Sequence, residues 1–215
     1  MNQRRGKGAD EGRREALGRS VCAVLLVLAC AASWFLLPGC GDRLGEAQSL
    51  EGQGDTAAAL QIYAEIIENE PDNQAALEGA AVCLFSLKRF DEALVLQEKL
   101  AALDPTDAQI RVELGFNYLN HQERQADAAR VLAEAAEIQP TAKNLCFLAQ
   151  ARVAVGETGP AEQVLRQAID KEPGYAYSYQ LLVELLEGQG RAQEAEEVAR
   201  LAASRGLTVT GTSTS

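Results

Sequence analysis

Apolar residues recur three and four positions apart through most of residues 42–205, the spacing that gathers them on one face of an α-helix. Glycine, proline and aspartate interrupt this pattern at short intervals, as they do where helices end and turns form. Alanine and leucine supply most of the apolar positions, and runs of β-branched or aromatic residues are scarce. The chain is therefore predicted to be all-α. The predicted helices are 42–51, 56–69, 76–87, 90–103, 111–120, 126–138, 145–155, 160–169, 177–187 and 193–203.

Two residue types recur in phase along these helices. The prolines are Pro71, Pro105, Pro140 and Pro173, and the alanines are Ala59, Ala93, Ala128, Ala161 and Ala195. The intervals are 34, 35 and 33 residues for proline and 34, 35, 33 and 34 residues for alanine. Each of the four prolines follows its alanine by 12 residues. The agreement of two residue types predicts a repeat in which two helices form a hairpin and proline ends the second helix.

These hairpins resemble tetratricopeptide repeats, whose period is about 34 residues. The residues that carry the resemblance are Leu114, Gly115 and Tyr118 in a first helix, and Tyr63, Ala93 and Pro105 in second helices and a linker. The resemblance implies a right-handed α-solenoid of about five hairpins over residues 42–205. The implied repeats are 42–73, 74–107, 108–141, 142–175 and 176–206, followed by a disordered tail at 207–215. Arg43 and Glu46 depart from the pattern in the first repeat, the third repeat has one extra residue near 121–125, and the fourth lacks one near 141–144.

Helix packing gives a physical reason for the recurring alanine. Helices approach to about 8 Å only where small residues lie at the crossing, and the five alanines are predicted to lie there. A single hairpin cannot bury its own apolar face, so each repeat depends on its neighbours.

Residues 21–38, VCAVLLVLACAASWFLLP, form an uncharged apolar stretch of 18 residues. As a helix this stretch would extend about 27 Å, close to the hydrocarbon thickness of a bilayer. Residues 1–20 are predicted to be disordered and carry six basic and three acidic side chains, which favours their retention in the cytoplasm. We therefore expect a single-pass protein of the cell membrane, with residues 21–38 in the membrane and the repeats on the extracytoplasmic side.

Three fates of this apolar segment stay open. It is retained as a membrane anchor, or it is cleaved as a secretory signal and frees the protein, or it is a lipoprotein signal. Residues 36–42, LLPGCGD, resemble the lipobox of bacterial lipoproteins, in which the cysteine becomes the lipidated first residue of the mature chain. Leu37, Gly39 and Cys40 match the lipobox, and Pro38 departs from it. The resemblance therefore implies lipidation of Cys40 after cleavage before it.

Charge and motifs exclude several classes of function. The net charge is −11, and since residues 1–20 contribute +3, residues 21–215 carry −14. We expect no nucleic acid partner, because such binding depends on lysine and arginine.

The chain has one histidine, His121 in a predicted turn, and no CxxC pair, so no metal site is predicted. Cys83 and Cys146 are predicted to be small buried residues. No phosphate loop, nucleophile elbow or HExxH motif occurs, so we expect no catalytic site, cofactor or small-molecule substrate.

The tetratricopeptide resemblance implies a binding groove lined by the first helix of each pair, which holds a peptide or helix of a protein partner. The groove candidates are Glu78, Val82, Phe85, Val112, Phe116, Leu119, Lys143, Gln150, Tyr177, Gln180 and Glu184. Phe85 and Phe116 either contact the partner or pack against a neighbouring repeat. Glu78, Val82, Glu113 and Phe116 occupy the places where one variant of the family binds a C-terminal carboxylate with lysine and asparagine, so that carboxylate clamp is not expected.

Two hypotheses of function follow. The first is a membrane-tethered scaffold or adaptor that organises other proteins on the extracytoplasmic side. The alternative is a lipoprotein that resembles tetratricopeptide lipoproteins acting as assembly or chaperone factors for envelope or secretion components. A non-catalytic enzyme subunit is a third class and needs a catalytic partner.

Overall fold

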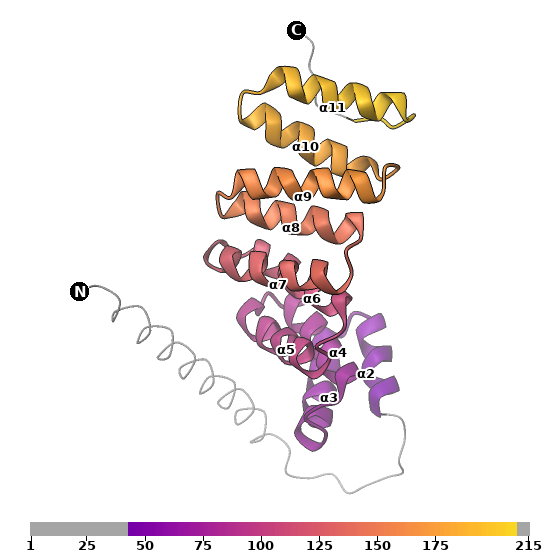
Figure 1. Cartoon of the computed structure of the whole chain (residues 1–215). Helices are drawn as coiled ribbons and strands as arrows, with labels where there is room; N and C mark the ends of the chain where they lie inside the picture. Colours follow the sequence, from indigo (N-terminus) through magenta and orange to yellow (C-terminus); the bar gives the residue numbers. More distant parts are fainter. Residues whose placement is uncertain (1–42, 210–215) are drawn as a thin grey trace, which may run out of the picture. The chain divides into compact units, whose positions relative to one another are not determined.

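The structure, a computed structural model, describes residues 43–209 (Figure 1). The expected anchor at 21–38, Cys40 and the end of the expected tail lie outside these residues. The described residues contain ten α-helices, one 3₁₀-helix and no strand, which confirms the all-α prediction for this range. No helix between residues 43 and 209 combines the length and the apolar character needed to cross a membrane.

The ten helices follow one another in the order that the periodicity predicts. They are α2 (Arg43–Gly52), α3 (Thr56–Asn69), α4 (Gln74–Ser86), α5 (Phe90–Leu103), α6 (Ala108–Leu119), α7 (Gln125–Ile138), α8 (Ala142–Ala154), α9 (Thr158–Lys171), α10 (Ala176–Gly188) and α11 (Ala192–Ser204), with the 3₁₀-helix η1 (Gln122–Arg124) before α7. The chain divides into two compact units, the first ending at Leu100 and the second beginning at Ala101.

Several helices begin earlier than predicted because side chains cap them. α6 begins at Ala108 rather than at 111, since the Asp107 carboxylate accepts hydrogen bonds from the first free backbone amides. α8 begins at Ala142 rather than at 145, since the Thr141 hydroxyl oxygen accepts a hydrogen bond from the backbone amide of Asn144 at 3.2 Å.

The additional residue in the third repeat is accommodated by η1. The guanidinium carbon of Arg124, at the end of η1, lies 4.3 Å from the centre of the Tyr118 ring.

Four turns between successive helices share one backbone geometry, and the turn that contains η1 does not. Gly54, Lys88, Gly156 and Gly190 follow the first helix of their pairs and all have positive φ. Glycine adopts this conformation at little cost, whereas an L-residue such as Lys88, with φ of 60°, is strained there.

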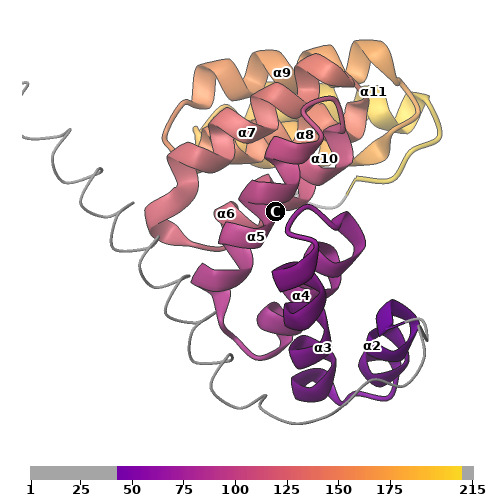
Figure 2. The same ribbon diagram turned by 90° about the horizontal axis from the view of Figure 1, so that it is seen from below.

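In the first unit, α3 packs on both α2 and α4, and α2 also contacts α4 (Figures 1 and 2). Its core includes Ala47, Ala59, Ile62, Tyr63, Ala76, Ala80 and Cys83. The ring of Tyr63 lies directly against the backbone of Gly79, and its hydroxyl donates to Glu51 Oε2 at 2.8 Å. Burial, reinforced by the Glu51 carboxylate, raises the pKa of Tyr63 well above its ordinary value.

In the second unit, α6 to α11 stack in chain order, and the first helices of neighbouring pairs also touch, α6 with α8 and α8 with α10. Gly115 lets α6 approach the side chain of Leu132 on α7. Arg111 is buried and donates to the carbonyls of Asp104 and Asp107 at 3.1 and 3.2 Å, so it covers the end of α5 and the turn that follows. The five recurring alanines of the two units are at most 1 % exposed, which confirms the predicted helix register.

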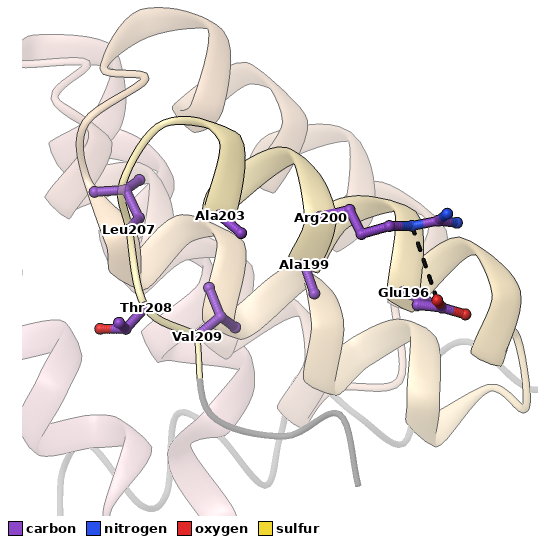
Figure 3. Close-up of a pocket in the computed structure, with 7 residues that line it drawn as sticks. All are labelled: Glu196, Ala199, Arg200, Ala203, Leu207, Thr208 and Val209. Carbon is purple, nitrogen blue, oxygen red and sulfur yellow. Dashed lines mark ion pairs between the residues drawn. The ribbon is translucent and has the colours of Figure 1, made fainter. Parts of the chain in front are cut away.

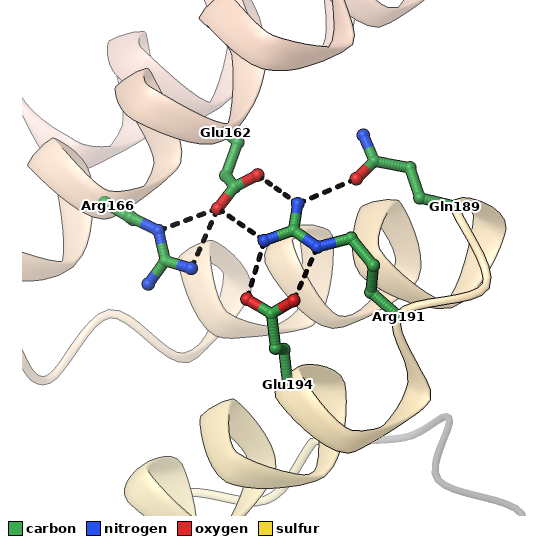
Figure 4. A network of polar contacts seen from close by, with 5 residues as sticks. All are labelled: Glu162, Arg166, Gln189, Arg191 and Glu194. Carbon is green, nitrogen blue, oxygen red and sulfur yellow. Dashed lines mark hydrogen bonds and ion pairs between the residues drawn. The ribbon is translucent and has the colours of Figure 1, made fainter.

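An arginine holds the last pair of helices against α9 (Figure 4). Arg191, in the turn between α10 and α11, pairs with Glu162 of α9 at 2.5 Å and with Glu194 of α11 at 2.6 Å. Arg166 also donates to Glu162, at 2.8 Å. The hydrogen bond from Arg191, with the one from Arg166, holds the pKa of Glu162 below its usual range.

The end of the described chain turns back along α11 (Figure 3). Leu207, Thr208 and Val209 have no regular secondary structure and, with the α11 face that includes Ala199 and Ala203, enclose a shallow pocket of about 410 Å³. Glu196 and Arg200 form an ion pair of 3.9 Å at its rim.

Candidate functional site

The first helices of the second unit carry a row of aromatic side chains. Phe116 on α6 packs edge to face with Phe147 on α8, with ring centroids 6.1 Å apart. Farther along α8, Gln150 donates from Nε2 to the Tyr177 hydroxyl on α10 at 2.8 Å, and Tyr177 packs edge to face with Tyr175 at 6.3 Å. We call Phe116, Phe147, Tyr175 and Tyr177 the aromatic row. It runs over three successive first helices.

Polar contacts link α8 to α10 and to the residue that follows α9. Cys146 Sγ on α8 and Ser178 Oγ on α10 lie 3.3 Å apart in the interior. Glu172, after α9, accepts a hydrogen bond from the backbone amide of Ala142 at 2.8 Å and so caps the start of α8. The spacing of the aromatic rings is therefore set by the stacking of the helices.

The aromatic row remains open to solvent. Phe116 is 50 % exposed although it touches Phe147, and Tyr177 is exposed as well. Large apolar side chains that stay in water on an otherwise well-packed protein are typical of a contact site.

Charged and amide groups flank the row. Glu113 lies three residues before Phe116 on α6, and its carboxylate accepts from Gln109 Nε2 at 2.9 Å. On α10, Glu184 accepts from Gln180 Nε2 at 2.6 Å. Lys143, at the start of α8, is exposed. The face therefore combines rings for apolar side chains with acceptors and donors for a backbone or a polar side chain.

The sequence-predicted candidates of the second unit divide into two groups. Phe116, Gln150 and Tyr177 lie in or against the aromatic row, and Lys143, Gln180 and Glu184 flank it. Leu119 is half-buried. Val112 is only 4 % exposed, so its inclusion as a groove residue was wrong. The short β-branched side chain of Val112 packs inward.

Sequence reasoning missed Phe147. This residue lies four positions after Lys143 and three before Gln150, so it shares their side of the helix. That spacing is the signal that identifies it. Tyr175 precedes α10 and has no helical periodicity, so its contact with Tyr177 depends on the fold of the turn.

The candidates of the first unit lie along α4. Glu78 and Val82 are exposed, Val82 by 50 %, and Phe85 is half-buried with its ring 6.3 Å from that of Phe90. Phe85 therefore packs within its own hairpin and also keeps part of its surface open.

The two cysteines of the described chain are poor nucleophiles. Cys83 and Cys146 are free and buried. Burial raises the pKa of Cys83 to about 11 and raises that of Cys146 as well, so both stay protonated thiols at neutral pH. The chemistry that the described surface offers is contact with rings, amides and carboxylates.

Comparison with known proteins agrees with this geometry. A family model described as tetratricopeptide repeat matches residues 44–108. A crystal structure of MamA is similar to the chain with a TM-score of 0.64 and 20 % identity, covering 80 % of this chain and 96 % of MamA. The chain has the tetratricopeptide repeat fold.

Two further structures with this tetratricopeptide fold are similar to the chain. MamA 41-end from Desulfovibrio magneticus RS-1 gives a TM-score of 0.64 at 19 % identity over 78 % of this chain and 99 % of that one. YrrB, described as a tetratricopeptide repeat protein with an unusual peptide-binding site, gives a TM-score of 0.61 at 18 % identity over 75 % of this chain and 84 % of YrrB. The curated proteins give no match.

Proposed function

We propose that this chain binds another protein through the aromatic row of its tetratricopeptide repeats and serves as a scaffold or adaptor tethered to the membrane. The observation that carries the proposal is the exposure of Phe116 and Tyr177 on helices that are otherwise tightly packed. Exposed aromatic rings at the centre of a surface supply much of the binding energy of a protein interface.

The similarity to YrrB supports a peptide as the bound element, because that protein is described as having a peptide-binding site in the same fold. The row on α6, α8 and α10 offers successive rings with amide groups between them, which suits a peptide that crosses the helices. Residues 43–209 carry 14 basic and 27 acidic side chains, a balance of −13, so an acidic partner is disfavoured.

The proposed tether is the uncharged segment 21–38. Its length suits a bilayer, and the basic residues before it favour an extracytoplasmic position for the repeats. The alternative is a lipid anchor on Cys40 after cleavage, which would suit an assembly factor for envelope or secretion components. The mass of the mature chain distinguishes the two. Retention of residues 1–39 supports the transmembrane anchor, and a chain that begins at a diacylated Cys40 supports the lipoprotein.

Site-specific photocrosslinking of the full chain in intact cells tests the binding face. A photoreactive phenylalanine replaces Phe147, and the matched control places the same probe at Leu201, which is 43 % exposed on α11 of the same unit. We expect one discrete crosslinked protein from position 147 and none from position 201. The Phe116→Glu variant should abolish that crosslink while retaining the helical circular dichroism spectrum. Equal crosslinking at both positions, or a crosslink unaffected by Phe116→Glu, would place the contact elsewhere and refute the proposal.

A further inference from the structure

A second apolar surface lies at the turn between α4 and α5 in the first unit. It consists of Val82, Phe85, Leu87 and Phe90, which we call the turn patch. Leu87 and Phe90 are each 41 % exposed, Val82 is one helical turn before Phe85, and the rings of Phe85 and Phe90 are 6.3 Å apart. Four large apolar residues thus fall within nine positions of one turn.

The equivalent turns differ in composition. The residue before the positive-φ position is Gln53 in the first pair, Leu87 in the second, Val155 in the fourth and Gln189 in the last, so the place is apolar in two pairs and polar in two. The α2–α3 turn of the same unit, residues 52–55, contains only glycine, glutamine and aspartate. The helical hairpin itself therefore does not require apolar residues at this turn.

The charges around the turn patch balance. Lys88 and Arg89 contribute two positive charges, and Asp91 and Glu92 two negative ones. Arg89 is already paired with Glu92 at 2.6 Å. A surface that binds at this turn is therefore held by burial of apolar area rather than by charge, and its binding should depend little on salt.

The first unit cannot move far from the segment 21–38. Only residues 39–42 separate that segment from α2, and four residues span at most about 14 Å when extended. α2 contacts α4, and α4 with its 13 residues is about 20 Å long. Counting the linker, α2, the contact between α2 and α4, and α4 itself, the turn patch at the end of α4 stays within roughly 60 Å of the end of the segment.

We propose that the turn patch lies on the lipid surface and holds the first unit against the membrane. This inference rests on the proposed membrane tether, because the tether keeps the turn patch at a high local concentration beside the bilayer, where a weak apolar contact is sufficient. The aromatic row of the second unit is then left for the protein partner. Val82 and Phe85 are accordingly assigned to the membrane contact and not to the peptide groove.

Tryptophan quenching by brominated phosphatidylcholine tests the tether and the turn patch separately. The chain has a single tryptophan, Trp34, which lies in the segment 21–38. In the full chain reconstituted into phosphatidylcholine vesicles, quenching of Trp34 reports insertion of the tether. In a second variant, Trp34→Phe with Leu87→Trp, the only tryptophan reports the turn patch. The matched control is Trp34→Phe with Leu201→Trp, at a site of similar exposure on α11.

If the turn patch lies on lipid, bromination of the acyl chains should lower the emission of the Leu87→Trp variant about two-fold, equally at low and high salt, and leave the Leu201→Trp control unchanged. Quenching of Trp34 without quenching at position 87 would overturn the turn-patch proposal, leave the tether in place and indicate a protein ligand for the patch. Quenching at position 87 that disappears at high salt would overturn the apolar contact. Absence of quenching at Trp34 would overturn the tether and this inference together.

Discussion

Replacement of Gly79 by alanine sets two physical effects against each other. Gly79 lies within α4, where alanine is the better helix former by about 1 kcal/mol. The tertiary structure opposes the change, because a β-carbon at this position would lie 2.2 Å from Cζ, 2.5 Å from Cε2 and 2.6 Å from Cε1 of Tyr63. Tyr63 is 1 % exposed, so its ring has no free space into which to move.

The expected balance is destabilisation of the first unit. Overpacking of a core costs about 1–3 kcal/mol, and displacement of the ring breaks the 2.8 Å hydrogen bond to Glu51, worth about 1 kcal/mol. Overpacking should cost about 2 kcal/mol and the lost hydrogen bond about 1 kcal/mol, while the higher helix propensity of alanine restores about 1 kcal/mol. The free energy of unfolding should therefore fall by about 2 kcal/mol.

Urea denaturation of the detergent-solubilised full chain, followed by circular dichroism at 222 nm, measures this change, and hydrogen exchange should locate it in α3 and α4. The matched control is Gly52→Ala at the end of α2, where the added carbon meets no atom within 4 Å apart from those of its chain neighbours and its own helix backbone. The control should be neutral or up to about 1 kcal/mol more stable. The double variant Gly79→Ala with Tyr63→Leu should lose less stability than the sum of the two single changes. A Gly79→Ala chain as stable as the control would refute the close packing of Tyr63 on α4.

Three further outcomes follow from the structure. Lys88→Gly should raise the melting temperature. The change removes the strain of an L-residue at positive φ, about 1–2 kcal/mol, and this gain exceeds the cost of the entropy that glycine adds to the unfolded chain, about 0.5–1 kcal/mol. An unchanged or lower melting temperature would contradict that strain. The folded pKa of Glu162 is lowered from 4.5, so its stabilising contribution is complete above about pH 4.5 and is lost as the pH falls through the folded pKa. Urea titrations should therefore show the stability difference between the natural chain and Arg191→Gln shrinking in acid, and a difference that grows there would be inconsistent with the pair. Cys83 and Cys146 should resist alkylation at about pH 8 until urea unfolds the chain, as peptide masses would show, because both thiols are buried and protonated.

Most of the helical segments could be predicted from local spacing. The predicted helices 56–69 and 90–103 coincide with α3 and α5, since apolar periodicity and the flanking turn residues are properties of neighbouring positions. α6 and α8 begin three residues before their predicted starts, because the side chains of Asp107 and Thr141 cap them, whereas apolar periodicity begins only at the first buried positions. The division into five repeats stays a prediction, and the structure instead separates two units between Leu100 and Ala101.

The candidate site was only partly predictable. The periodicity predicted Phe116, Gln150 and Val112 for the same face. Phe116 and Gln150 lie in or against the aromatic row, whereas Val112 is buried. Position in a repeat fixes the direction of a side chain approximately, whereas burial depends on the size of that side chain and on the neighbouring helix. The pairing of Phe116 with Phe147 joins two different repeats, so no pattern within one repeat indicates it.

By itself, the amino-acid sequence determined the period, the helical hairpins and the small alanines at the crossings, because each follows from residue types at short, regular separations. Only the tertiary structure decided which side chains remain in water. Leu87 at a turn and Leu201 on the last helix stay exposed, while Arg111, which composition alone would place on the surface, is buried over the carbonyls of Asp104 and Asp107. Exposure is settled by contacts between residues far apart in the chain, and a single buried arginine or exposed leucine leaves the local period unchanged.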